Sequence, residues 1–96
     1  MEKDLVIRAV QEYDALSISE KKVFIELLNI QVNYMVIASV KSISRQTNCP
    51  VPTIYSALKK LRINNYITKI DDQSHSYKLN TDKIEFIVNV YQNKKA

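Results

Sequence analysis

Hydroxyl and basic side chains gather in residues 51–64, whose sequence is VPTIYSALKKLRIN. Hydroxyl groups can bond to the edges of bases, and lysine or arginine can bind guanine and phosphate. Ile54, Leu58 and Leu61 recur at helical spacing in the same segment, with Ala57 beside them. This spacing predicts a helix that buries one apolar stripe and presents its hydroxyl and basic groups elsewhere. Such a surface suits the major groove of a nucleic acid.

The charge of the chain is concentrated around that helix. The 96 residues carry a net charge of +4. Residues 27–70 hold six basic side chains and no acid, whereas the remainder holds eight basic side chains against ten acids, a net of −2. A solvated surface normally mixes both signs, so this separation favours binding to a polyanion.

A second, shorter helix and a turn must position residues 51–64. Ser39 is a good N-cap, and Val40 and Ile43 give the helix that follows it a small apolar face. Asn48-Cys49-Pro50 predicts the turn, because Asn tolerates the left-handed conformation and Pro50 moves Cys49 out of the helical region. Asn64-Asn65 can end the second helix in the same left-handed conformation.

The flanking segments predict three further helices and three strands. We expect a helix over residues 3–16 and another that starts at the capping box of Ser17 and Glu20 and runs to about Asn29 or Val32. Strands are expected at 34–38, 66–70 and 76–80, the last two around a turn at 71–75. A last helix over 82–93 should be capped by Thr81-Asp82.

The segment ISRQTNCPVPTIYSALKKLRINNYI resembles the helix-turn-helix of winged-helix DNA-binding proteins, and the resemblance covers about residues 34–80. It implies one mainly α domain with a small β-hairpin (α+β) over 1–96, in which 39–65 are the helix-turn-helix and 66–80 the wing. The helix from Val51 would then enter the major groove. The base-facing candidates are Pro52, Thr53, Tyr55, Ser56 and Lys59. The phosphate-binding candidates are Lys41, Arg45, Lys60, Arg62, Lys69 and Lys78.

The predicted wing tip departs from the family pattern. Wings that enter the minor groove carry basic residues at the tip, because the groove has a negative potential. Here the tip reads DDQSH over residues 71–75, and its two carboxylates would be repelled by phosphate. We therefore expect contacts from the flanks of the wing rather than from its tip.

The last helix predicts a self-association surface. Ile84, Ile87, Val88 and Tyr91 form one apolar stripe, and Phe86 and Val90 form a second line on another side. A small domain has little to cover the second line, so we expect a homodimer whose interface includes Leu5, Phe86 and Val90. The alternative is that the N-terminal helix covers these residues within one chain.

The composition argues against several other classes of protein. With one His, one Cys and no Gly, the chain has neither the material for a catalytic triad nor a glycine-rich phosphate loop. We expect no enzyme activity, no cofactor and no metal site, and we expect Cys49 to be a reduced turn residue. The sequence contains no apolar run of membrane-spanning length, so a cytoplasmic protein is expected.

Two biological uses fit these features. One is a transcriptional repressor that resembles the small MarR-, PadR- and ArsR-like regulators. The other is a centromere-binding adaptor of plasmid or phage partition, which works with a filament-forming partner. The chain resembles such adaptors in its length and in its PTIYSAL helix. A third possibility of a different class is a winged-helix module that binds another protein. The sequence leaves all three open.

Overall fold

The computed structural model describes residues 2–71 and 74–95 of the chain. Its elements follow one another in the order helix, helix, strand, helix, helix, strand, strand, helix. They are α1 (Lys3–Gln11), α2 (Ile18–Ile30), β1 (Met35–Ile37), α3 (Val40–Thr47), α4 (Val51–Ile63), β2 (Ile67–Lys69), β3 (Ser76–Leu79) and α5 (Thr81–Lys95). This is the α+β winged helix-turn-helix architecture that the sequence predicts.

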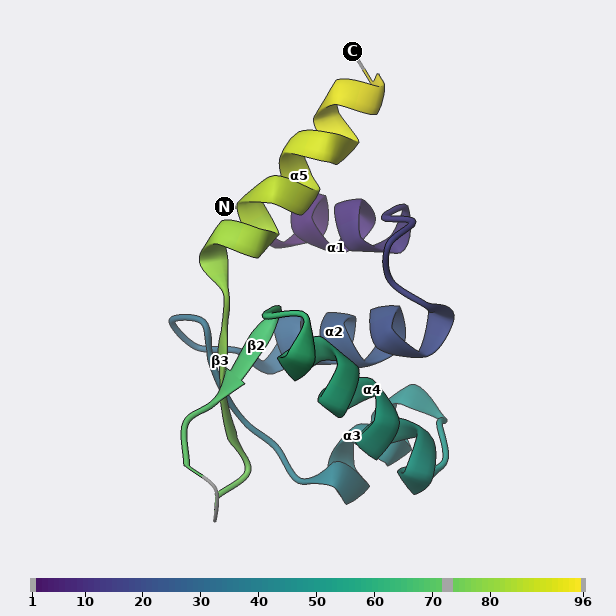
Figure 1. Cartoon of the computed structure of the whole chain (residues 1–96), viewed down its shortest axis with the longest axis vertical. Helices are drawn as coiled ribbons and strands as arrows, with labels where there is room; N and C mark the ends of the chain where they lie inside the picture. The colour runs from purple at the N-terminus through teal and green to yellow at the C-terminus, as the bar shows by residue number, and fades with distance from the viewer. Residues whose placement is uncertain (1, 72–73, 96) are drawn as a thin grey trace.

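The helices form two groups with α2 between them (Figure 1). At one end, α5 packs on α1, and at the other, α3 and α4 form the helix-turn-helix. The three strands make one antiparallel sheet in the order β1-β3-β2, so the hairpin of β2 and β3 is the wing and β1 pairs with its far side. The molecule is elongated, with extents of 42 × 24 × 22 Å.

One apolar core connects these elements. Its largest fully buried side chains come from every helix and every strand, and they include Phe24, Ile43, Leu61, Leu79 and Ile87. The predicted capping box starts α2: the Glu20 amide donates to Ser17 Oγ (3.2 Å), and the Ser17 amide donates to Glu20 Oε1 (3.4 Å). Glu20 is thereby satisfied although it is almost fully buried.

Two predicted turns have the expected left-handed residues. Asn48 (φ 57°) ends α3, and Asn65 (φ 66°) follows α4. A third turn was not predicted: Asn33 (φ 52°) and Tyr34 (φ 64°) are both left-handed between Val32 and Met35, whose backbone groups exchange two 2.9 Å hydrogen bonds. Positive φ at both central residues is the signature of a type I′ turn, and this turn leads into β1.

The structure corrects three predicted boundaries. The first helix ends at Gln11 rather than residue 16, because the chain must reverse between α1 and α2, which pack on each other. Leu16 still reaches the core from the connecting turn. The last helix runs from Thr81 to Lys95 rather than over 82–93, because ion pairs hold its last turn to the α1–α2 connection, Lys94 to Asp14 at 3.4 Å and Lys95 to Glu12 at 3.7 Å.

The cap of α5 also differs from the prediction. Asn80 Oδ1, not Thr81 or Asp82, accepts from the amides of Asp82 (3.0 Å) and Lys83 (3.3 Å). Asn80 is favoured because its Nδ2 also donates to the Asn65 carbonyl (2.7 Å), which ties the cap to the end of α4. The predicted wing tip over 71–75 includes residues 72–73, which lie outside the described residues.

Candidate nucleic-acid interface

The turn between α3 and α4 fixes the direction of the second helix. Ser44 Oγ donates to the Cys49 carbonyl, so a side chain of α3 holds the turn. Thr47 Oγ1 donates to the Ile43 carbonyl (2.7 Å) within the last turn of α3. Pro50 precedes α4, and among the described residues no side chain caps the first turn of this helix. Its first amides therefore remain open to an external acceptor.

α4 buries the predicted stripe and exposes the predicted polar face. Ile54, Ala57, Leu58 and Leu61 are buried. Among the base-facing candidates, Pro52, Tyr55, Ser56 and Lys59 are exposed, and Thr53 is half-buried. At 100° per residue, Pro52, Ser56 and Lys59 lie near the middle of the exposed face, and Tyr55 and Thr53 lie at its two borders. The structure thus presents this set together on one side of α4.

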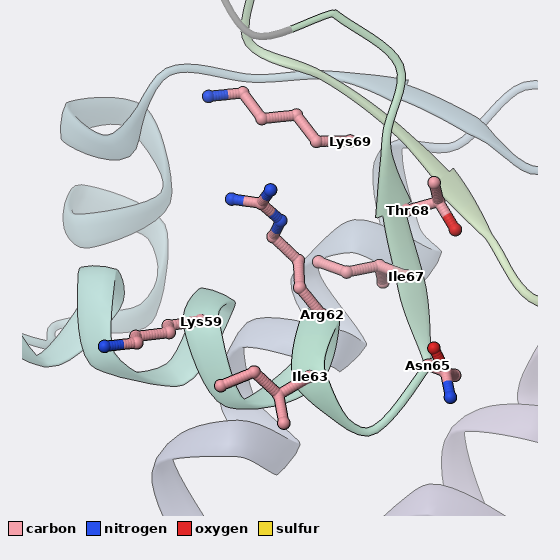
Figure 2. Close-up of a pocket in the computed structure, with 7 residues that line it drawn as sticks. All are labelled: Lys59, Arg62, Ile63, Asn65, Ile67, Thr68 and Lys69. Atoms are coloured by element: carbon pink, nitrogen blue, oxygen red, sulfur yellow. The ribbon is translucent and has the colours of Figure 1, made fainter.

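One border of this face opens into a hollow of about 480 Å³ between α4 and β2. Lys59 and Arg62 from α4 and Lys69 from β2 line it, together with Ile63, Asn65, Ile67 and Thr68. Figure 2 shows the cationic ends of Lys59, Arg62 and Lys69 extending to the same side of β2. We call Lys59, Arg62 and Lys69 the basic cluster.

The basic cluster has no acidic residue among the described side chains that line its hollow. Three like charges around one open space raise the local positive potential, which favours an anion such as phosphate. Tyr77 on β3 is buried, which raises its pKa above the ordinary value, and the positive charge of the nearby Arg62 opposes the shift. Arg62 therefore lies against the wing as well as on α4.

The opposite border of α4 faces the start of α2 across a second hollow of about 270 Å³. Thr53, Ser56 and Lys60 line it from α4, and Ser17, Ser19 and Glu20 line it from α2. The predicted phosphate ligand Lys60 therefore lies apart from Arg62, on the other side of the helix. Arg62 and Lys60 therefore lie on either side of Ser56.

The remaining phosphate candidates do not join the basic cluster. Lys41 and Arg45 are exposed one turn apart on α3, so they form a separate basic pair. Lys78 is paired with Met35 and Thr68 across the sheet and is exposed, whereas its neighbour Tyr77 is buried. Because strand residues alternate between faces, Lys78 lies on the outer face of the sheet, opposite to Lys69.

Three residues beside the cluster were missed by the sequence reasoning. Ile63 is 65% exposed near the middle of the polar face of α4, and Asn65 and Thr68 line the same hollow as the basic cluster. Ile63 could have been found from its helical position, since it follows Ser56 and Lys59 by seven and four residues. Asn65 and Thr68 depend on how the wing folds back on α4, which no local pattern specifies.

The predicted dimer residues have mixed environments. Leu5 and Val90 are half-buried, and Leu5 packs on the core. Phe86 is 56% exposed and contacts Tyr13 edge to face, with ring centroids 6.4 Å apart. The N-terminal helix and the turn after it therefore cover part of the predicted dimer surface within one chain. Of the three predicted dimer residues, Phe86 stays the most exposed.

Within residues 2–71 and 74–95, no group of three His, Cys, Asp or Glu side chains is arranged to hold a metal ion. The helices of the same residues include none that is both long and apolar enough to cross a membrane.

The fold has a counterpart among solved structures. Neither a protein-family model nor a curated protein matches the sequence. A structure of TrmBL2, described as an archaeal chromatin protein with a novel mode of DNA binding, is similar to this chain with a TM-score of 0.63 at 17% sequence identity. The match covers 98% of this chain and 35% of TrmBL2, so the present chain corresponds to about a third of that protein. At this identity the similarity establishes the fold.

Proposed function

We propose that this protein binds double-stranded DNA, with α4 in the major groove. The observation that carries the proposal is the exposed face of α4, where Ser56 and Lys59 lie between Arg62 on one border and Lys60 on the other. Base-edge contacts from the middle of the face would read the sequence, and cations at its borders would bind the phosphates of the two strands.

Additional basic side chains extend this surface. Lys69 would bind backbone from the wing, and Lys41 and Arg45 would do so from α3. Lys78 would bind phosphate only if the DNA backbone curves around the outer face of the wing. The TrmBL2 similarity supports the proposal, because that protein of the same fold is described as binding DNA.

We further propose that two copies act together as a homodimer, with Leu5, Phe86 and Val90 in the interface. The exposed ring of Phe86 supports this, since a large aromatic side chain is costly to leave in water. A two-fold pair would place two α4 helices on two half-sites. As to biological use, a cytoplasmic repressor and a centromere-binding partition adaptor with a filament-forming partner both fit this surface.

The test is a footprint on the DNA that flanks the gene, followed by affinity measurements at several salt concentrations. Lys60→Ala should weaken binding evenly on the protected sequence and on random DNA, and should lower the salt-dependence slope by about one charge. Ser56→Ala should instead change the preference between the two DNAs, because a base contact carries sequence information. Lys94→Ala, at the far end of α5, is the matched control and should leave both affinities unchanged.

The outcomes separate the alternatives. One two-fold protected site over a promoter indicates a repressor, and a long array of protected repeats indicates a centromere. Equal losses on both DNAs for Lys60→Ala and Ser56→Ala would remove the assignment of Ser56 to base reading. Absence of protection at low salt would exclude the groove-binding proposal and favour a protein-interaction module.

A further inference from the structure

A patch of exposed aliphatic side chains covers the outer side of the sheet, away from α4. It is formed by the end of α2, the turn after it, strand β1 and the residue after β2. Its members are Ile30 (41% exposed), Val32 (71%), Met35 (49%), Ile37 (83%) and Ile70 (47%). They line one shallow hollow together with Val36 and Ser76. We call these five aliphatic residues the sheet patch.

The strand register explains why these side chains are neighbours. Ile37 pairs with Ser76 on β3, and the Ile70 amide donates to the Ser76 carbonyl (3.0 Å). Ile37, Ser76 and Ile70 therefore form a row across the sheet, in which the small Ser76 leaves the hollow between two isoleucines. Met35 lies beside Lys78 in the next row on the same face. Lys78 is thus the cation that borders the patch.

Neither the core nor the DNA-binding surface explains this patch. On β1 the buried residue is Val36, and Met35 and Ile37 on either side of it are exposed, so they contribute little to the core. The sheet order β1-β3-β2 places β2 against α4 and β1 at the far edge. The sheet patch and the basic cluster therefore lie on opposite faces and can be occupied at the same time.

The size of the patch points to a second copy of the chain. With the exposures given above, the five side chains present on the order of 500 Å² of apolar surface, which is near the largest patch of an ordinary monomer. Two copies joined face to face would bury on the order of 1,000 Å², which is about the least that a specific interface requires. A two-fold arrangement would also put aliphatic surface against aliphatic surface, with no charged member of either patch to desolvate.

We propose that the sheet patch is a self-association surface through which two copies of this protein pair, separate from the α5 surface around Phe86. If both surfaces pair by two-fold axes, each copy has two different neighbours, and the assembly is an open row rather than a closed dimer. Pairing through the sheet patch leaves the basic cluster of every copy exposed.

The experiment is sedimentation equilibrium of the purified protein without DNA, at physiological salt, over a wide concentration range. Ile37→Glu is the test variant, because a two-fold contact brings the two introduced carboxylates near each other. The dissociation constant for self-association through the sheet patch should rise at least about tenfold in this variant. Val32→Glu is a second test variant with the same expected result. Ile18→Glu is the control, since Ile18 is 75% exposed on α2 and outside the patch.

The wild type and Ile18→Glu should associate beyond the pairing that the α5 surface alone supports. Ile37→Glu and Val32→Glu should lose that further association, with circular dichroism and melting that match the control. Equal association of all four proteins would overturn the proposal, as would a wild type that stays monomeric at the highest concentration. A loss in Phe86→Glu alone would assign the association to α5 and overturn it too. Because no DNA is present, failure of the DNA-binding proposal would not affect these readouts.

Discussion

α4 and α5 are built in the same way and differ in what they expose. Each buries one apolar stripe, around Leu61 in α4 and around Ile87 in α5. The exposed face of α4 carries three cations and no acid, whereas α5 carries Asp82 and Glu85 beside its three lysines. The last two lysines of α5 are engaged with acids of the α1–α2 connection.

The difference shows that amphipathicity and function are separate properties of a helix. The buried stripe decides where a helix packs, and both helices satisfy that requirement equally. The charges of the exposed face decide what the helix can bind, because paired charges of both signs cancel at a distance and unpaired cations do not. The unpaired cations of α4 suit a polyanion, whereas the mixed charges of α5 do not.

The largest expected effect tests the buried stripes. Leu61→Ala in α4 and Ile87→Ala in α5 should each lower the free energy of unfolding by about 3 kcal/mol, because each removes a side chain that is almost wholly buried. Urea denaturation followed by circular dichroism measures both. A loss below about 1 kcal/mol in either variant would show that its helix is not an equal part of the core.

A smaller effect tests the exposed faces. Arg62→Glu should weaken DNA binding at least about tenfold, which is about 1.4 kcal/mol, since it replaces a cation of the basic cluster by an anion. Lys94→Glu makes the same change in α5, far from α4, and should alter affinity by less than about twofold. Fluorescence anisotropy with a labelled duplex measures both. Equal losses would mean that net charge matters and its placement does not.

The smallest effect tests the two helix starts. Asn80→Ala should lower the free energy of unfolding by about 1 kcal/mol, because it leaves the first amides of α5 without their acceptor. Pro50→Ala, at the uncapped start of α4, removes no cap bond and should lower the free energy of unfolding by about 0.5 kcal/mol, because the unfolded chain becomes freer. Asn80→Asp is the control that keeps the cap and loses the Nδ2 bond to Asn65. If Asn80→Asp is as unstable as Asn80→Ala, the bond to Asn65 matters more than the cap.

The helix-turn-helix could be predicted from the sequence because local signals specify it. Asn48 and Pro50 determine the turn through their own backbone preferences, and the spacing of Ile54, Leu58 and Leu61 determines the buried side of α4. The capping box that starts α2 is equally local, and it was also predicted correctly. The winged-helix fold follows from these signals together with the hairpin pattern.

Features that depend on contacts between distant segments could not be predicted. Thr81 and Asp82 fit the sequence pattern of an N-cap as well as Asn80 does, and the choice depends on the bond between Asn80 and Asn65. The separation of Lys69 from Lys78 depends on which face of the sheet packs on the core. The grouping of Lys69 with Lys59 and Arg62 depends on the packing of β2 against α4.

The turns of this protein have a consequence for its denatured state. The sequence has no glycine, and within the described residues the left-handed positions are taken by Asn33, Tyr34, Asn48 and Asn65. A left-handed residue with a side chain costs about 1 kcal/mol in the folded protein. The same side chain restricts the unfolded chain, which lowers the entropy lost on folding by an amount worth about 0.4–1 kcal/mol per position. Replacing these residues by glycine would therefore relax the native turns while making the denatured ensemble larger, with little net gain in stability.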